Sequence, residues 1–90
     1  MDSSEKISNL RAEIDEIDEH LVILLLKRFS YTKEIGNVKA SNAMDIDNLE
    51  REKDIIEHLS NKANHNLKKE DISAIFKLIF NISKKFQKIK

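Results

Sequence analysis

The chain has 90 residues, with 16 basic and 16 acidic side chains, and its formal net charge at pH 7 is zero. A balanced charge excludes a general electrostatic attraction to nucleic acid or to a membrane surface. The chain has no Cys, which excludes disulfides, thiol catalysis and thiolate metal sites. It also has no Pro and only one Gly, which predicts a single all-α domain over residues 1–90. The lack of Cys, together with a polar start unlike a signal peptide, favours a cytoplasmic protein.

The first predicted helix is unusually long. It begins at Ser3 or Ser4, small hydroxyl residues suited to an N-cap, and continues as far as the stretch at residues 41–45. That is about 36 residues, or about 54 Å of helix. A compact chain of this size has a radius of gyration of about 12 Å. We therefore expect the helix to project beyond a monomer and to need a partner, for which a homodimer is the simplest solution.

Positions along this helix that alternate in spacing between three and four predict the buried seam of a coiled coil. The seam holds one charged residue, and its members are Ile7, Leu10, Ile14, Ile17, Leu21, Leu24, Arg28, Tyr31, Ile35 and Val38. The Arg28 guanidinium keeps its charge at any ordinary pH, so it needs an anion from the protein or from a ligand. Taken alone, an arginine in a seam is more often a register device or a snorkelling side chain than a ligand clamp.

The second helix is predicted from residue 47 or 48 to residue 64. Asp47 and Glu50 have the spacing of a capping box. Glu52 is a second ionisable residue in an otherwise apolar stripe. It either pairs with Arg28 in a structural salt bridge or belongs to a binding site.

The third helix is predicted over about residues 68–88. One of its stripes is apolar throughout, with the members Ile72, Ile75, Ile79, Ile82, Phe86 and Ile89. The adjoining stripe begins with Phe76 and Phe80 and turns polar at Ser83 and Gln87. The lysines at the end of the helix are expected to be solvated and to complement its C-terminus rather than to bind nucleic acid; they are Lys84, Lys85, Lys88 and Lys90.

Arg11 and Lys39 lie 28 residues apart, each directly after a seam position, and so share one edge of the first helix. By the helical rise they are about 42 Å apart, which one substrate cannot bridge. In an antiparallel dimer, Arg11 of one chain approaches the Lys39 region of the other. Only three of the basic residues are Arg, the side chain suited to bidentate carboxylate recognition.

Residues on all three predicted helices together form a recognisable series. They are Leu10, Arg11, Ile14, Asp18, Leu21, Arg28, Ile35, Gly36 and Lys39 on the first, Arg51 and Glu52 before residues 54–57 on the second, and Phe76, Ile79, Ser83 and Gln87 on the third. In this order and spacing the chain resembles the all-helical chorismate mutases over about residues 5–88. The resemblance implies an intertwined homodimer of three-helix chains with two sites. It also implies an isomerase that converts chorismate to prephenate in aromatic amino-acid biosynthesis, by a [3,3] Claisen rearrangement, with no metal or cofactor.

The resemblance further implies which residues hold the substrate. Arg28, together with Arg11 from the partner chain, would clamp its two carboxylates. Lys39 would donate a hydrogen bond to a carboxylate and to the ether oxygen, and the Gln87 amide would donate to that same oxygen. A neutral amide is a donor at any working pH, which suits this role.

Four more residues are implied on the other side of the substrate. Glu52 would accept a hydrogen bond from the ring hydroxyl, assisted by the backbone near Asn48. Ser83 would bind a carboxylate, and Arg51 would hold Glu52 and add positive potential. The family often has Asp where this chain has Asn48. Asn is tolerated there if the backbone N–H makes the contact.

Two other functions fit parts of the sequence. An isochorismate pyruvate-lyase shares this fold and binds a similar dianion, although the Arg51–Glu52 pair and the Ser83…Gln87 spacing favour the mutase. A non-catalytic dimerisation module would use the charged seam residues only to fix register. The three histidines have no metal-ligand spacing and are expected at the surface; they are His20, His58 and His65.

Overall fold

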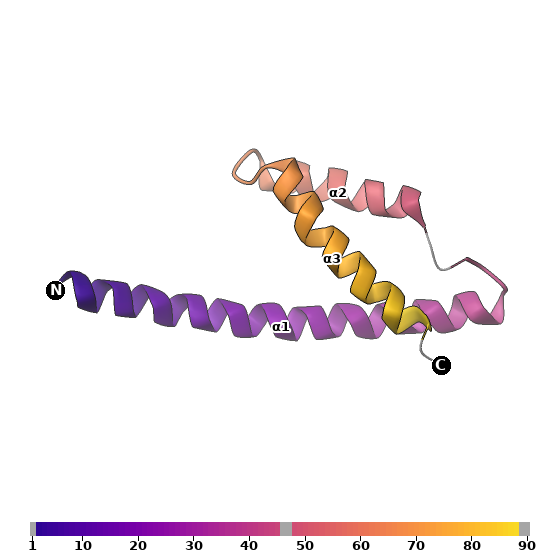
Figure 1. The fold of residues 1–90 in the computed structure, drawn as a ribbon, viewed down its shortest axis with the longest axis horizontal. Helices are drawn as coiled ribbons and strands as arrows, with labels where there is room; N and C mark the ends of the chain where they lie inside the picture. Colours follow the sequence, from indigo (N-terminus) through magenta and orange to yellow (C-terminus); the bar gives the residue numbers. More distant parts are fainter. Residues whose placement is uncertain (1, 46–47, 89–90) are drawn as a thin grey trace.

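The computed structural model describes residues 2–45 and 48–88. These ranges fold into three α-helices and contain no strand: α1 (Ser3–Ser41), α2 (Leu49–Ala63) and α3 (Lys69–Lys88). α1 runs the length of the molecule, and α2 and α3 form a hairpin beside its C-terminal half (Figure 1). α3 packs against both other helices. The predicted all-α chain with a long first helix is confirmed, and every described helix end lies within a residue or two of its predicted position.

The N-terminal cap of α1 differs from the prediction. The helix begins at Ser3, but the N-cap is Asp2, whose carboxylate oxygen accepts a hydrogen bond from the Glu5 N–H at 2.8 Å. The prediction of a serine cap was therefore wrong. Asp is as good an N-cap as Ser, and its charge also complements the positive end of the helix dipole.

Asparagine side chains mark both ends of α2. The Asn48 side-chain oxygen accepts a hydrogen bond from the Arg51 N–H at 3.0 Å and so caps the helix N-terminus. Asp47, the predicted capping-box residue, lies outside the described residues. At the other end Asn64 adopts a left-handed conformation with φ of 49°, which Asn tolerates better than most residues. Asn48, which stands where the family named in the sequence analysis often has Asp, therefore serves as the N-cap of α2.

The core of the protomer lies where α3 crosses the C-terminal half of α1. The rings of Phe29 and Phe86 stack there, with centroids 5.0 Å apart and planes 10° apart. Gly36 on α1 and Phe80 on α3 are also buried. α1 therefore faces α3 with the stripe next to the predicted seam, while the apolar members of the seam stay exposed.

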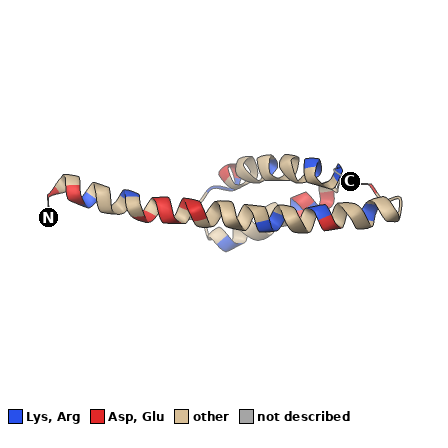
Figure 2. Ribbon diagram, turned by 90° about the horizontal axis from the view of Figure 1, so that it is seen from below, with Lys and Arg blue, Asp and Glu red and all other residues tan. Residues whose placement is uncertain are grey.

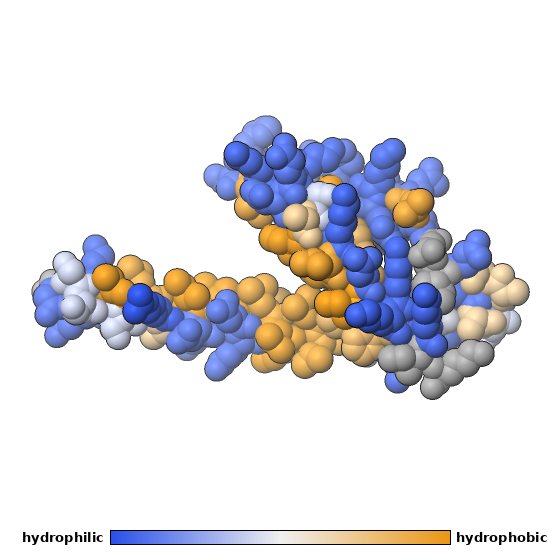
Figure 3. Space-filling view, viewed as in Figure 1, coloured by the Kyte–Doolittle hydropathy of each residue, from blue (hydrophilic) through white to orange (hydrophobic). Residues whose placement is uncertain are grey.

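The predicted seam of α1 is not buried within the protomer. Its apolar side chains are about half exposed along the whole helix, for example 49% at Ile7, 55% at Leu10 and 62% at Leu24. Figure 3 shows this apolar surface running along α1 beyond the part that α3 covers. On α3, Ile75 and Ile82 of the predicted apolar stripe are also exposed, while Ile89 lies outside the described residues. An exposed apolar surface of this length is unusual for a monomer.

The molecule is elongated because of its long first helix. Its radius of gyration is 17.2 Å and it measures 60 × 29 × 15 Å, whereas a compact chain of this size has a radius of about 12 Å. The N-terminal half of α1 accounts for the difference, because it extends away from α2 and α3 (Figure 1). In the described ranges, no helix carries an apolar stretch long enough to cross a membrane.

Candidate active site

A cleft of about 420 Å³ opens where the three helices meet, near the C-terminal ends of α1 and α3 and the start of α2. This volume is in the usual range for small-molecule sites. Seven of the eight predicted site residues line it: Arg28, Lys39, Asn48, Arg51, Glu52, Ser83 and Gln87. Residues that lie up to 59 positions apart in the sequence are thus brought to one place.

The eighth predicted residue, Arg11, lies elsewhere. It is exposed on the N-terminal half of α1, 17 residues before Arg28. Along a helix this separation is about 26 Å. Arg11 therefore cannot enter the cleft of its own chain.

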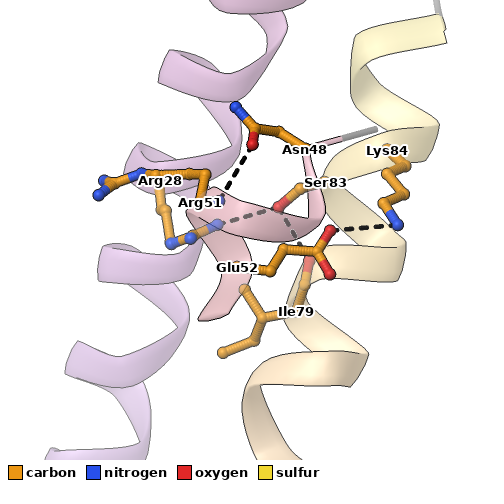
Figure 4. Close-up of polar contacts among 7 residues, drawn as sticks. All are labelled: Arg28, Asn48, Arg51, Glu52, Ile79, Ser83 and Lys84. Atoms are coloured by element: carbon orange, nitrogen blue, oxygen red, sulfur yellow. Dashed lines mark hydrogen bonds and ion pairs between the residues drawn. The ribbon is translucent and has the colours of Figure 1, made fainter. Parts of the chain in front are cut away.

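Arg28 reaches into the cleft and is held by α3. Its guanidinium donates a hydrogen bond to the Ser83 hydroxyl oxygen at 3.0 Å, and that hydroxyl donates to the Ile79 carbonyl at 2.8 Å (Figure 4). The guanidinium carbon also lies 5.7 Å from the centre of the Phe80 ring, within cation–π range. Because the Ser83 hydrogen is committed to Ile79, its oxygen is free to accept from Arg28. Ser83 thus fixes the direction of the guanidinium.

The charge of Arg28 has no protein counterion in the described ranges. Burial and the nearby charge of Arg51 lower the pKa of Arg28, in that order of importance, but a guanidinium stays protonated near neutral pH. Ion pairs between described residues include Lys69 with Glu57 and Lys84 with Glu52. Of the two alternatives considered for Glu52, the structural salt bridge with Arg28 is therefore not formed, since Glu52 pairs with Lys84. The anion that Arg28 needs remains to be supplied from outside this part of the chain.

Glu52 is paired with a lysine that the sequence analysis assigned to solvent. The Lys84 ammonium lies 3.2 Å from the Glu52 Oε2 atom, both side chains are only about a quarter exposed, and both line the cleft. The prediction that Lys84 is merely solvated was wrong, and Lys84 occupies the position beside Glu52 that was expected for Arg51. The only signal in the sequence was its place directly after Ser83, which turns it toward α2.

Gln87 lines the cleft from the last turns of α3. Its Oε1 atom is buried and has no hydrogen-bond partner within the described residues. Buried amide oxygens are normally paired, so this end of the cleft is incomplete without a further group. Lys39 lines the same cleft from the last turn of α1. Across residues 2–45 and 48–88, no three His, Asp or Glu side chains gather in a way that would hold a metal ion.

The fold and the cleft define an all-helical protein with a cation-rich site suited to a small anion. Comparison with known proteins specifies the family. The family model "Chorismate mutase type II" matches residues 10–88, which is most of the chain. The chain therefore belongs to the chorismate mutase type II family, in agreement with the resemblance found from the sequence.

Individual relatives agree with this assignment. A "Chorismate mutase" of Methanocaldococcus jannaschii is 31% identical over 85 residues, covering 93% of this chain and 86% of the relative. A "Bifunctional chorismate mutase/prephenate dehydratase" of Buchnera aphidicola is 36% identical over 89 residues, covering 98% of this chain but only 23% of the relative. A protein of the same description from Aquifex aeolicus is 40% identical over 55 residues, which is 61% of this chain and 15% of the relative. The family and these relatives indicate an isomerase of the chorismate mutase type.

Proposed function

We propose that this chain converts chorismate to prephenate, as an intertwined homodimer with two equivalent clefts. The observation that carries the proposal is the state of Arg28. It is aimed into a cleft lined by six further predicted site residues, and within the described ranges no carboxylate pairs with it. A dianionic substrate supplies the missing charge.

The reaction asks little of the protein beyond position and charge. One C–O bond breaks and one C–C bond forms within a single molecule, so no nucleophile or general acid is needed. The protein must hold a flexible dianion in a chair-like conformer and stabilise the charge that grows on the ether oxygen. A cleft with preset cations and a neutral amide donor is suited to both tasks.

Each role follows from the resemblance and from the place of the side chain. Arg28 and Arg11 of the partner subunit clamp the two carboxylates, which suit the planar fork of arginine. Lys39 donates to a carboxylate and to the ether oxygen. Gln87, whose buried Oε1 atom has no hydrogen-bond partner among the described residues, donates to the same oxygen once its NH₂ group faces the substrate.

Residues at the start of α2, on the opposite wall of the cleft, bind the ring hydroxyl. Glu52 accepts a hydrogen bond from it, and the backbone near Asn48 assists. Ser83 adds a contact to a carboxylate, in addition to orienting Arg28. Arg51 contributes positive potential from the first turn of α2, where it already influences Arg28.

The exposed seam of α1 supports the homodimer. A second copy of the same seam would cover the apolar side chains that the protomer leaves about half exposed. Charge favours an antiparallel arrangement (Figure 2). Five of the seven residues at positions 13–19 are acidic, while residues 27–39 hold four basic residues and one acidic residue. Antiparallel pairing brings these unlike halves toward each other, whereas parallel pairing would set like charges side by side.

The same arrangement accounts for Arg11. In an antiparallel pair, the N-terminal half of α1 from one chain runs along the C-terminal half of α1 in the other. Arg11 is then carried toward the cleft of the partner subunit, whereas it cannot reach the cleft of its own chain.

We also propose a cytoplasmic location, which the lack of Cys in the sequence supports.

The direct test is an assay of the purified protein with chorismate. We expect chorismate to be consumed and prephenate to accumulate, with a dimer seen by analytical ultracentrifugation. Arg28→Ala should lose turnover, while Lys33→Ala, a change of an exposed cation on the same helix, should not. Turnover no faster than the uncatalysed reaction would overturn the proposal. Release of pyruvate from isochorismate in its place would favour the lyase.

A further inference from the structure

The ion pair between Glu52 and Lys84 forms one wall of the cleft. The Lys84 ammonium contacts the Oε2 atom of Glu52 at 3.2 Å, and the two side chains are 25% and 23% exposed. Figure 4 shows Lys84 reaching from α3 toward Glu52 on α2, across from the hydrogen bond between Arg28 and Ser83. Both residues of the pair line the same cleft as Arg28. The pair is thus part of the site and not of the outer surface.

Two consecutive residues of α3 serve the two facing helices. Neighbouring side chains on a helix point about 100° apart. Ser83 therefore turns toward α1, where it accepts from Arg28, while Lys84 turns toward α2, where it meets Glu52. The same turn of α3 orients a cation on one side and a carboxylate on the other.

The geometry leaves part of Glu52 available. A carboxylate has two oxygens and about four acceptor directions. Lys84 contacts Oε2, so Oε1 can accept a hydrogen bond from a ligand in the cleft. A lysine on one oxygen fixes the orientation of the carboxylate.

The ion pair between Glu52 and Lys84 also affects the net charge of the cleft. Within the described lining of the cleft, Glu52 is the only carboxylate, and the cations are Arg28, Lys39, Arg51 and Lys84. A bare carboxylate would repel the substrate dianion. Lys84 offsets that charge at close range, which allows an acceptor for a hydroxyl to stand in a site for anions.

We propose that Lys84 is a positioning residue, which holds the Glu52 carboxylate in place to accept the ring hydroxyl of the substrate. The inference rests on the proposed function, because it assumes that chorismate occupies this cleft. In this proposal Lys84 acts through Glu52 and does not contact a substrate carboxylate directly. A hydrogen bond to a charged group is commonly worth about tenfold or more in binding.

A double-mutant cycle tests this on the full chain. The variants are Lys84→Met, Lys84→Arg, Glu52→Gln and Glu52→Gln with Lys84→Met, assayed with chorismate. We expect Lys84→Met to lower kcat/KM about tenfold and Lys84→Arg to restore most of it. In the Glu52→Gln background, Lys84→Met should change kcat/KM by less than about twofold, because the group through which it acts is already altered. Lys85→Met, at an exposed neighbouring lysine of α3, is the matched control and should behave as wild type.

A second readout separates positioning from a structural effect. Lys84→Met should weaken binding of a chorismate analogue without the ring hydroxyl less than binding of a matched analogue that carries it, since the lost Lys84 charge affects both ligands and Glu52 accepts a hydrogen bond only from the second. An equal loss for both ligands, or a full Lys84→Met loss in the Glu52→Gln background, would overturn the inference while leaving the proposed function intact. A wild-type chain without chorismate turnover would overturn the proposed function, and this inference with it.

Discussion

Gly36 and Gln87 are in backbone contact where α3 crosses α1. A Cβ atom at Gly36 would lie 2.6 Å from the Cα of Gln87, 2.7 Å from its carbonyl oxygen and 2.9 Å from its Cβ. Two of these three atoms belong to the backbone of Gln87 and cannot swing aside. Gly36 has no positive φ, so space and not backbone conformation requires glycine here. The absence of one side chain on α1 thus sets how deeply Gln87 sits in the cleft.

We predict that Gly36→Ala impairs catalysis more than folding. The new methyl group must push the last turns of α3 outward and displace Gln87. Overpacking costs about 1–3 kcal/mol, partly offset by about 1 kcal/mol of helix propensity gained by Ala over Gly. Displacing a catalytic group by about 1 Å can lower the rate about a hundredfold. Steady-state kinetics should therefore show kcat reduced at least tenfold, with a small change in thermal unfolding.

The neighbouring position supplies the control for this prediction. Asn37 is exposed on the same turn of α1, and Asn37→Ala should leave kcat near the wild-type value. If Gly36→Ala kept full activity, the close contact would not be what positions Gln87.

A second prediction concerns the cost of Arg28 to the free protein. Burial and the charge of Arg51 lower the pKa of Arg28, which means that its charged form is disfavoured in the empty cleft. Arg28→Met retains the apolar stem and removes the charge, so we expect the melting temperature to stay level or rise. The same change should lower kcat/KM at least about a hundredfold, because charge-assisted contacts to a carboxylate are lost. A sharp fall in melting temperature would instead assign Arg28 to the fold.

The sequence predicts those features of the site that depend on the pattern within a single helix. The spacing of the first helix was sufficient to single out Arg28, because a charge in an apolar series is visible without coordinates. The helix ends were also predictable to within a residue or two, although the N-cap of α1 is Asp2 and not a serine. The spacing did not reveal, however, which stripe of α1 packs on α3 within one chain. The series is about half exposed, and Phe29 beside it is the residue that packs on α3.

Contacts between helices were beyond the sequence for a different reason. Lys84 is one of several lysines near the end of α3 and only its angle to α2 distinguishes it, which depends on how the two helices pack. Gly36 belongs to the series that carries the resemblance, but a single glycine in a helix does not reveal which backbone passes over it. Both residues act at the crossing of two helices, where sequence patterns of single helices carry little information.

A third prediction addresses the shared site. Arg11→Ala and Arg28→Ala should each inactivate the enzyme. When the two variants are refolded together, about half of the dimers contain one chain of each kind. Such a dimer has one cleft with both arginines intact and one cleft with neither. Activity should return to about a quarter of the wild-type value, measured as chorismate turnover. Each variant refolded alone gives the baseline, and a mixture that stays at this baseline would mean that Arg11 does not act across subunits.

A fourth prediction concerns pH and follows from two groups assigned to the substrate, the Gln87 amide and the Arg28 guanidinium. Gln87 does not titrate, and Arg28 stays protonated near neutral pH despite its lowered pKa. The rate should therefore be level through neutral pH. Gln87→Glu replaces the amide with a carboxyl, which donates only when protonated, so its activity should rise as the pH falls toward the ordinary carboxyl pKa of about 4.3. Gln87→Met, which cannot donate, should be slow at every pH. A Gln87→Glu profile parallel to wild type would contradict hydrogen-bond donation by this side chain.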